Sequence, residues 1–392
     1  MTTTEPTTSE SGRELVREVL IHGPIARAEL GRRLGLSPAS LTRLSKPFLD
    51  RGLFVEGAVE LAGAVGRPAK PLDVRVDRHR FVGVKLTGDQ AHGVLTDLRA
   101  QPLGEHVADL GGQSPEEVVE ALVAVVEALT AGAPRAGSAG VAALEGVGVS
   151  IGGKVAGQRV VVRAPFLAWR EVDLGGMLAA RLGVPVVVEN DVVALTEAVR
   201  WFGPGRGVDD VAVLTVGAGV GYGLVVHGRQ VITPDTGLGL GGHVPLDPAG
   251  PVCVDGHRGC STAMLSTTSM CASAAVGLGR PVSYDELLAL AASGDPVAVQ
   301  VVGTAGRSLG RMIAAVANLT MVGTVVLSGE GVGLVDVPVA ATELRAGIAA
   351  DRDPDASEVR VLTGSADFGA WARGAAAVAV QARIGALGVL GA

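Results

Sequence analysis

Aromatic residues and cysteines are scarce in this sequence of 392 residues. Phe, Trp and Tyr together make up 3% of the chain, so Ala, Val and Leu must fill most of the hydrophobic core. The three cysteines, Cys253, Cys260 and Cys271, lie in one region, and their odd number argues against a disulfide framework. This cysteine usage is typical of proteins that remain in a reducing cytoplasm.

Long apolar runs and targeting segments are also missing. No apolar run reaches the ~18 residues of a membrane span without a charged or polar break. The N-terminal stretch MTTTEPTTSE lacks the basic and apolar parts of a secretory signal, and we expect residues 1–12 to form a disordered tail. The 57 glycines show no fixed period, which excludes a collagen-like chain. The sequence therefore predicts a cytoplasmic globular protein of two or three domains with no membrane segment.

Charge is distributed unevenly along the chain. The formal net charge is −7, yet residues 1–75 carry eleven Lys and Arg against nine Asp and Glu. Within residues 27–51 the count is six basic against two acidic side chains. An acidic protein with one basic module indicates that any contact with nucleic acid is confined to that module.

Three short helices are predicted in the basic module, over residues 13–22, over 26–34, and from the cap Ser37 and Pro38 onward. Gly35 allows a sharp turn before the third helix, and this arrangement is typical of a helix-turn-helix. Polar and basic side chains cover the outer face of the third helix, and we expect them to contact double-stranded DNA: Ser37, Ser40, Thr42, Arg43 and Lys46.

A basic loop follows the third helix. We expect Pro47 to kink or end that helix near Ser45, because proline removes a backbone hydrogen bond. Two strands, over 53–56 and 72–76, then flank a loop in which Arg67 stands between Gly66 and Pro68. This pattern predicts a wing that places Arg67 in a minor groove or against phosphate, and a DNA-binding domain over residues 13–78. The alternatives are a solvated linker for the loop, and a helix-turn-helix retained for dimerisation alone.

From residue 79 onward, strands and helices alternate, which indicates an α/β architecture. A buried strand over 184–188 delivers Asn190 and Asp191 to its carboxyl end, where open α/β sheets bind ligands. Asp191 has the position of a general base for a substrate hydroxyl. The residues alone favour the alternative, in which Asp191 caps the helix that begins there.

The segment Gly217–Gly223, GAGVGYG, matches the spacing of a dinucleotide-binding loop. Such a loop must open a helix, but here a second apolar run follows, which predicts a β-hairpin instead. Glycine-rich hairpins of this kind approach phosphate in actin-like kinases. A tight hairpin without a ligand is the alternative.

A glycine-rich loop over residues 237–262 holds His243, Cys253, Asp255 and Cys260. The spacing His-x9-Cys-x-Asp-x4-Cys can gather four donors around one metal ion, and both thiolates and carboxylates bind zinc. The alternative is a pair of buried thiols in a loop held by its own hydrogen bonds.

Taken in order, these pieces resemble the ROK family of repressors, open reading frames and kinases. The stretches that carry the resemblance are SPASLTRLSKPFLDRGL, RAPFLAWREVDL, VVVENDVVALTEA, TVGAGVGYG and GGHVPL with CVDGHRGC. The resemblance implies a winged helix-turn-helix before a two-lobed, actin-like (ribonuclease H-like) α/β fold, with lobes over residues 79–199 and 200–392. It also implies a sugar site between the lobes, contacted by Asn190, Asp191 and His243, and a homodimer or homotetramer.

Several residues depart from the family pattern. Lys85 takes the place of an acidic residue that helps position Mg-ATP in family kinases, and Leu240 and Thr262 replace two glutamates of the family's sugar site. The family's zinc site has one histidine and three cysteines, and Asp255 stands in the place of one of these cysteines. His257 is a substitute donor. We therefore expect no catalytic residues and no enzyme activity.

The prediction is a transcriptional regulator, a repressor of carbohydrate-related genes, with structural zinc and a sugar or sugar phosphate as effector. The alternatives are a regulator with another effector or none, and an ATP-dependent sugar kinase.

Overall fold

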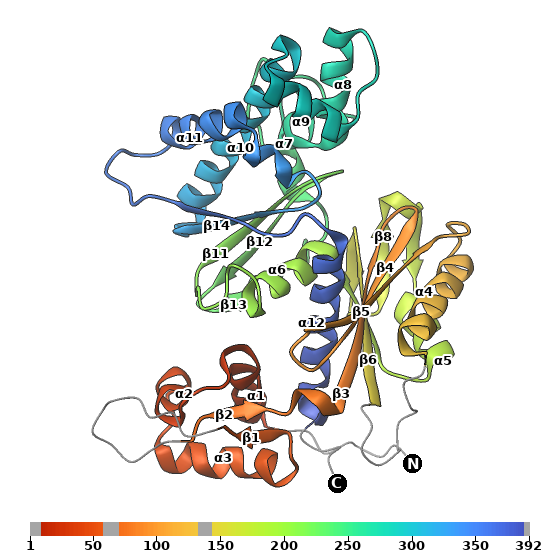
Figure 1. The fold of residues 1–392 in the computed structure, drawn as a ribbon, viewed down its shortest axis with the longest axis vertical. Coiled ribbons are helices and arrows are strands. Elements are labelled where there is room, and N and C mark those ends of the chain that lie inside the picture. Colours follow the sequence, from red (N-terminus) through yellow and green to blue (C-terminus); the bar gives the residue numbers. More distant parts are fainter. Residues whose placement is uncertain (1–8, 58–69, 132–142, 388–392) are drawn as a thin grey trace. The chain divides into compact units, whose positions relative to one another are not determined.

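The computed structural model describes residues 9–57, 70–131 and 143–387 (Figure 1). The chain forms two compact units. The first combines Met1–Ile151, Val155–Glu189 and Trp371–Ala392, and the second combines Gly152–Lys154 with Asn190–Ala370. This division differs from the predicted lobes, because the main boundary falls at residue 189 and the last helix belongs to the first unit.

Three helices and a two-stranded antiparallel sheet form the N-terminal part of the first unit, in the predicted order. Ser37 caps the third helix by accepting a hydrogen bond from the Ser40 amide, and Gly35 adopts the left-handed conformation that the preceding turn requires. The elements are α1 (Glu10–His22), α2 (Arg27–Leu34), α3 (Pro38–Asp50), β1 (Phe54–Glu56) and β2 (Leu72–Val74).

Pro47 was predicted to kink or end the third helix near Ser45, and the helix does not end there, since α3 continues to Asp50. The extra turn places Phe48 in the core with 4% of its surface exposed, and its ring lies 5.1 Å from that of Phe54. Burial of a phenylalanine contributes about 1.5–3 kcal/mol, which offsets most of the ~3 kcal/mol that an internal proline costs. Tertiary packing therefore overrides the local signal.

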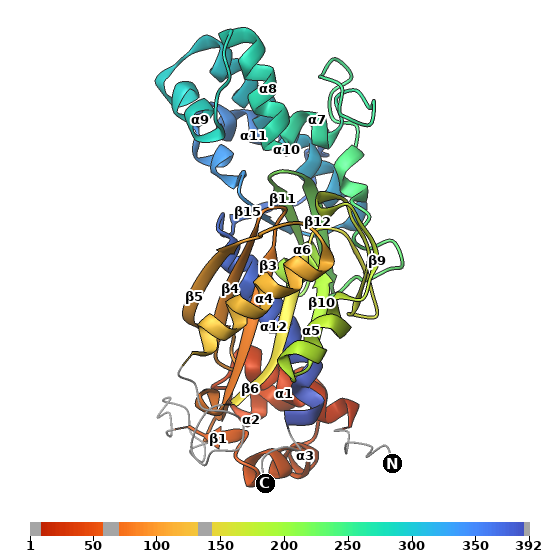
Figure 2. The same ribbon diagram turned by 90° about the vertical axis from the view of Figure 1, so that its right-hand side faces the viewer.

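A five-stranded sheet of order β10-β6-β3-β4-β5 forms the centre of the first unit. Helix α4 covers one face and α12 the other, as the turned view shows (Figure 2). A Cβ atom at Gly83 in β3 or Gly148 in β6 would collide with the backbone of α12 at Ala372 or Ala375. The elements of this unit are η1 (Val76–Arg78), β3 (His79–Leu86), β4 (Gln90–Thr96), β5 (Pro102–Asp109), α4 (Pro115–Thr130), β6 (Ala143–Ile151), β7 (Lys154–Ala156), β8 (Val160–Ala164), η2 (Pro165–Leu167), β9 (Trp169–Val172), α5 (Leu174–Leu182), β10 (Val186–Asn190) and α12 (Phe368–Leu387).

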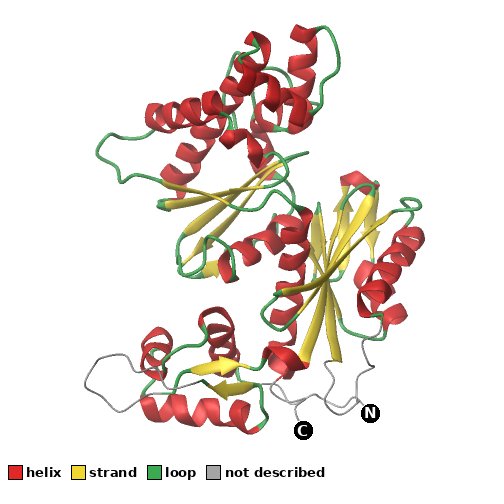
Figure 3. Ribbon diagram, viewed as in Figure 1, coloured by secondary structure: helices red, strands yellow, loops and turns green. Residues whose placement is uncertain are grey.

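The sheet of the second unit has the order β13-β12-β11-β14-β15, which repeats the topology of the first. Figure 3 shows the strands of the two sheets as separate groups. In each unit three consecutive strands run antiparallel, and a later strand pairs in parallel with the first of them. The elements are α6 (Asp191–Trp201), β11 (Val211–Val216), β12 (Val220–Val226), β13 (Arg229–Gln230), η3 (Leu240–His243), α7 (Ser261–Leu265), α8 (Thr267–Leu278), α9 (Tyr284–Ser293), α10 (Pro296–Thr320), β14 (Thr324–Ser328), η4 (Val332–Asp336), α11 (Pro338–Asp351) and β15 (Arg360–Thr363). The α/β, two-lobed fold class predicted from the sequence is confirmed.

Among the described residues, no single helix is both long and apolar enough to cross a membrane. Helices α9 and α10 satisfy length and composition only as a pair bent by 107°.

Candidate functional site

The outer face of α3 carries the side chains predicted to contact DNA. Arg43 and Lys46 lie one turn apart and are both exposed. The hydroxyl groups nearby are tied to the helix itself: Ser37 donates to the Ser40 hydroxyl over 3.0 Å, and Thr42 donates to the Pro38 carbonyl over 2.9 Å. The two cationic side chains are thus the groups of this face that extend into solvent.

Arg27 was not singled out from the sequence, yet it fixes α3 in place. Its guanidinium donates to the Ser45 hydroxyl over 3.2 Å and to the Glu56 carboxylate over 2.8 Å. The Arg27 guanidinium holds the pKa of Glu56 below its usual value. The partners lie 18 and 29 residues away, so no local pattern could have revealed them. Arg67 lies outside the described residues, and Lys70 is near Glu56, at 3.6 Å.

Arg99 connects the helical part to the sheet of the first unit. Its guanidinium pairs with the Asp73 carboxylate and donates to the Val19 carbonyl at the end of α1. The next residue, Ala100, accepts a hydrogen bond from Arg373 of α12. The neighbouring residues Arg99 and Ala100 therefore link α1 to α12 through hydrogen bonds.

Asn190 and Asp191 stand where β10 ends and α6 begins. The Asn190 side chain accepts hydrogen bonds from the amides of Val192 and Val193 and donates to the Gly153 carbonyl over 2.8 Å. Asn190 is therefore the cap of α6, a role that the sequence had suggested for Asp191. The Asp191 carboxylate accepts from the Val192 amide over 2.9 Å and is partly exposed.

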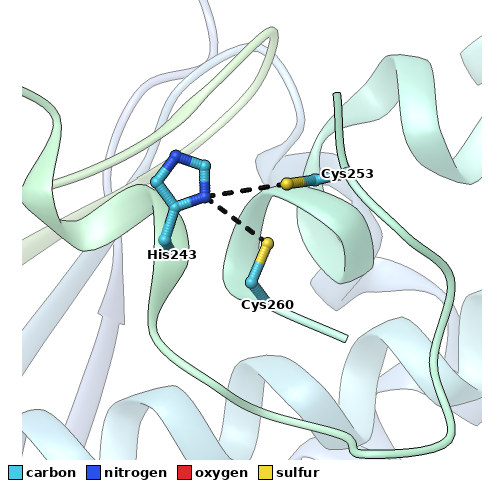
Figure 4. A group of neighbouring side chains, drawn as sticks. All are labelled: His243, Cys253 and Cys260. Carbon is cyan, nitrogen blue, oxygen red and sulfur yellow. Dashed lines mark hydrogen bonds between the residues drawn. The ribbon is translucent and has the colours of Figure 1, made fainter. Parts of the chain in front are cut away.

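Residues 237–262 bring His243, Cys253 and Cys260 together, in a group whose ligand atoms all lie within 4.8 Å of one another. Nδ1 of His243 lies 3.8 Å from the Cys253 sulfur and 3.6 Å from the Cys260 sulfur (Figure 4). The loop is held by antiparallel bridges from Pro245 to Cys260 and from Val252 to Arg258. These three predicted ligands form the kind of nitrogen and sulfur set that zinc prefers.

Asp255 was predicted to be a fourth ligand, but it does not belong to this group. Its carboxylate lies 3.3 Å from Nε2 of His243, the ring nitrogen that points away from the two sulfurs. His257 lies closer than Asp255 to the atoms that could bind the metal. Its Nδ1 is 3.2 Å from Nδ1 of His243 and 3.7 Å from the Cys253 sulfur. The turn after Cys253 explains this difference. It leaves Asp255 on its outer side, 60% exposed, and brings His257 back toward Cys253.

The two thiols differ in acidity. Burial raises the pKa of the Cys260 thiol, whose side chain is almost wholly enclosed. Burial also acts to raise the pKa of Cys253, but hydrogen bonds from the amides of Asp255 and His257 outweigh it and lower that pKa below its usual value. Cys253 is therefore the easier of the two to ionise to the thiolate that binds a metal ion.

The hairpin of β11 and β12 confirms that GAGVGYG opens no helix. The carboxylate of Glu330, which follows β14, accepts a hydrogen bond from the Ala218 amide at the tip of this hairpin, over 2.5 Å. A Cβ atom at Gly217 would collide with the same carboxylate. The sequence contains the segment SGEG that holds Glu330, but no pattern indicated where its side chain would lie.

Lys85 is buried in β3, with 6% of its surface exposed, and its ammonium lies 4.9 Å from the ring centre of Trp371 in α12. Leu240 is 61% exposed, and the hydroxyl of Thr262 donates to the Gly242 carbonyl over 2.6 Å. Lys85 and Thr262 therefore make contacts within the fold, whereas Leu240 faces solvent.

The fold and these stretches define the class of protein. The ROK family model matches residues 81–382, so the chain belongs to the ROK family. The DNA-binding transcriptional repressor Mlc of Escherichia coli K12 is 27% identical over 308 residues, which cover 76% of this chain and 75% of Mlc. A ROK family transcriptional regulator, described as a homologue of E. coli Mlc, superposes with a TM-score of 0.79 at 25% identity and covers 97% of both chains. A ROK family glucokinase from Streptomyces griseus, in complex with glucose and AMPPNP, gives a TM-score of 0.64 at 26% identity over 76% of this chain and 99% of its own.

Proposed function

We propose that this protein is a transcriptional repressor of carbohydrate-related genes that acts in the cytoplasm and binds its operator through a winged helix-turn-helix. The exposed pair Arg43 and Lys46 on α3 carries this proposal, because a capped helix with a cationic outer face fits the major groove. The Mlc repressor and the Mlc-like regulator, both similar over most of their length, support it. A homodimer or homotetramer would place two such helices ~34–36 Å apart on a palindromic operator.

Selection of duplexes from a random DNA pool by the full-length protein tests this function. A repressor should enrich one motif with inverted half-sites, since specific binding exceeds non-specific binding by at least ~10³-fold. Retention of DNA without enrichment of any motif would refute operator recognition.

The effector site is proposed at Asn190 and Asp191, with His243 as a further contact. The Asn190 amide is fixed by α6 and Gly153, while the Asp191 carboxylate is partly exposed and can accept hydrogen bonds from sugar hydroxyl groups. His243 would contact the sugar through Nε2, in exchange for the Asp255 carboxylate that lies 3.3 Å from this nitrogen in the free protein. A sugar or sugar phosphate is the effector class that fits this set best.

Replacement of Asp191 with asparagine should abolish most of the stabilisation by the effector. A sugar at 100 times its Kd stabilises the wild-type protein by about 2.7 kcal/mol, equivalent to a rise in Tm of about 5–10 °C. Because the amide donates where the carboxylate accepted, we expect D191N to lose most of this rise in a thermal-shift screen of sugars and sugar phosphates. The exposed Asp209 gives the matched control D209N, which should respond like the wild type. If no sugar shifts the wild-type Tm, the effector belongs to another chemical class.

Sugar phosphorylation is the second candidate function, and the similar glucokinase structure favours it. Two observations oppose it. The buried ammonium of Lys85 stands where family kinases have an acidic residue near Mg²⁺, and the Glu330 carboxylate already holds the amide that a phosphate would need. We therefore propose that the chain catalyses no phosphoryl transfer.

Removal of the Glu330 charge should allow phosphate to approach the hairpin. A carboxylate about 4 Å from a phosphate charge costs about 1–4 kcal/mol, depending on the local dielectric. We expect the E330Q variant to bind ADP at least ~5-fold more tightly than the wild type in isothermal titration calorimetry, with E358Q, at an exposed glutamate, unchanged. Neither E330Q nor the wild type should transfer phosphate from ATP to a hexose. Turnover by the wild-type protein would instead establish the kinase.

Structural zinc is the cofactor that we propose for His243, Cys253 and Cys260. Their ligand atoms converge, and two sulfurs with an imidazole nitrogen are donors that favour zinc over magnesium or calcium. Zinc would cross-link η3 to the start of α7 and so fix the loop beside them.

A further inference from the structure

A fourth donor lies against the three proposed zinc ligands. Nδ1 of His257 is 3.2 Å from Nδ1 of His243 and 3.7 Å from the Cys253 sulfur, and the two imidazole rings are tilted by 48° with centroids 4.4 Å apart. In the described structure, four atoms that bind zinc thus come from His243, Cys253, His257 and Cys260.

We infer that His257 is the fourth zinc ligand and that Asp255 is not a ligand but a carboxylate that orients His243. This inference rests on the zinc proposal and specifies its ligand set as two histidines and two cysteines. It differs from the set with Asp255 that the sequence predicts.

Four of the six separations between the proposed ligand atoms match the edges of a tetrahedron around zinc. With Zn–N of about 2.0 Å and Zn–S of about 2.3 Å, neighbouring ligands lie about 3.3 Å apart for two nitrogens and about 3.5 Å apart for nitrogen and sulfur. The corresponding distances here are 3.2 Å between the histidines and 3.6, 3.7 and 3.8 Å between nitrogen and sulfur. The group whose ligand atoms all lie within 4.8 Å of one another holds His243, Cys253 and Cys260, so the His257 ring would move toward Cys260 to complete the tetrahedron.

Asp255 lies where a carboxylate can orient a metal-binding histidine without itself binding the metal. Its carboxylate is 3.3 Å from Nε2 of His243, while Nδ1 of the same ring faces the sulfurs. A histidine that binds a metal through one nitrogen usually donates its other N–H to a carboxylate, which fixes the tautomer and the ring orientation. Asp255 can therefore serve His243 without reaching the ion.

A tight turn explains why His257 and not Asp255 faces inward. The Cys253 amide donates to the His257 carbonyl over 2.9 Å, and the Gly256 amide donates to the Cys253 carbonyl over 3.0 Å. Gly256 has φ of +85°, a conformation that side chains rarely adopt. Val254 is 97% exposed at the tip of the turn. The turn thus projects residues 254 and 255 outward and returns residue 257 to Cys253.

Charge also favours the pair of histidines. Two thiolates and two neutral imidazoles balance the charge of Zn²⁺, whereas replacing one imidazole with a carboxylate leaves an excess negative charge. The imidazole set therefore needs no further counter-charge.

Four full-length proteins test the ligand set: the wild type, H257A, H257C and D255A. We expect about one zinc ion per wild-type chain by elemental analysis. In competition with a chromogenic chelator, H257A should lose more than ~100-fold in zinc affinity, and D255A should lose about 10–100-fold, as is typical of an outer carboxylate. Circular dichroism of each variant shows whether the fold is kept.

Cobalt substitution separates the two roles. D255A should keep the tetrahedral Co²⁺ absorption of the wild type, and H257C should keep it with a sulfur-to-metal band stronger by about half, because three thiolates replace two. An altered Co²⁺ spectrum in D255A together with an unchanged one in H257A would overturn the assignment of His257. A wild-type chain that takes up neither zinc nor Co²⁺ would remove the metal centre itself.

Discussion

Operator affinity should fall at least ~100-fold when Arg43 and Lys46 are both replaced with alanine. A side chain that contacts a base edge contributes about 1–3 kcal/mol, and each lost phosphate contact lowers the dependence of binding on salt by about one unit of slope. Both side chains are exposed on α3, and the nearby hydroxyl groups of Ser37 and Thr42 are tied to the helix. Fluorescence anisotropy with the selected operator, over a range of salt concentrations, measures both quantities.

A control must separate the effect of losing two positive charges from the effect of losing them on α3. The variant R206A/R345A removes two exposed cationic side chains from the second unit and changes the net charge by the same amount. It should bind the operator within about 2-fold of the wild type, because neither residue belongs to the helix proposed to contact the DNA. Equal losses in the two double variants would show that α3 is not the recognition helix.

Replacing Gly83 with alanine is expected to destabilise the first unit by about 3 kcal/mol or more. The added methyl group would overlap the backbone of α12 at Ala372 and Ala376, and neither a strand nor a packed helix can move cheaply. The expected fall in Tm is about 6–12 °C for a unit of this size. Hydrogen exchange should show the loss of protection in α12 and β3.

A second glycine in the same sheet gives the control. Gly104 lies in β5, and a Cβ atom there would meet nothing within 4 Å. We expect G104A to leave the Tm unchanged or raised slightly, since alanine loses less backbone entropy than glycine on folding. An equal loss of stability in both variants would mean that the α12 contact does not account for the effect of G83A.

Local signals in the sequence were sufficient for much of the fold. Ser37 with Pro38 marked the start of α3, and the apolar run after GAGVGYG distinguished a hairpin from a dinucleotide-binding loop. Pro47 does not end α3 because the burial of Phe48, which depends on distant residues, offsets most of the local cost of the proline. The close approach of α12 to Gly83 joins positions almost three hundred residues apart, and spacing within one segment carries no information about it.

The candidate site was predictable in composition but not in geometry. The spacing of His243, Cys253 and Cys260 indicated a shared metal ion, and the structure brings these three together. The choice between Asp255 and His257 depends on the direction of a five-residue turn, which a ligand count cannot give. Glu330 could not be found at all, because its contact with Ala218 joins two strand ends that are 112 residues apart.

The place of α12 affects the order in which a newly made chain can fold. Its residues leave the ribosome after those of the second unit, yet they cover one face of the sheet built from β3 and β6, against Gly83 and Gly148. At ~5–20 residues per second, that sheet must wait on the order of ten seconds or more after β6 is made. The second unit, which has its own sheet and lies almost wholly in residues 190–370, can fold during this interval. The first unit, whose sheet is begun before the second unit is made, is therefore completed after it.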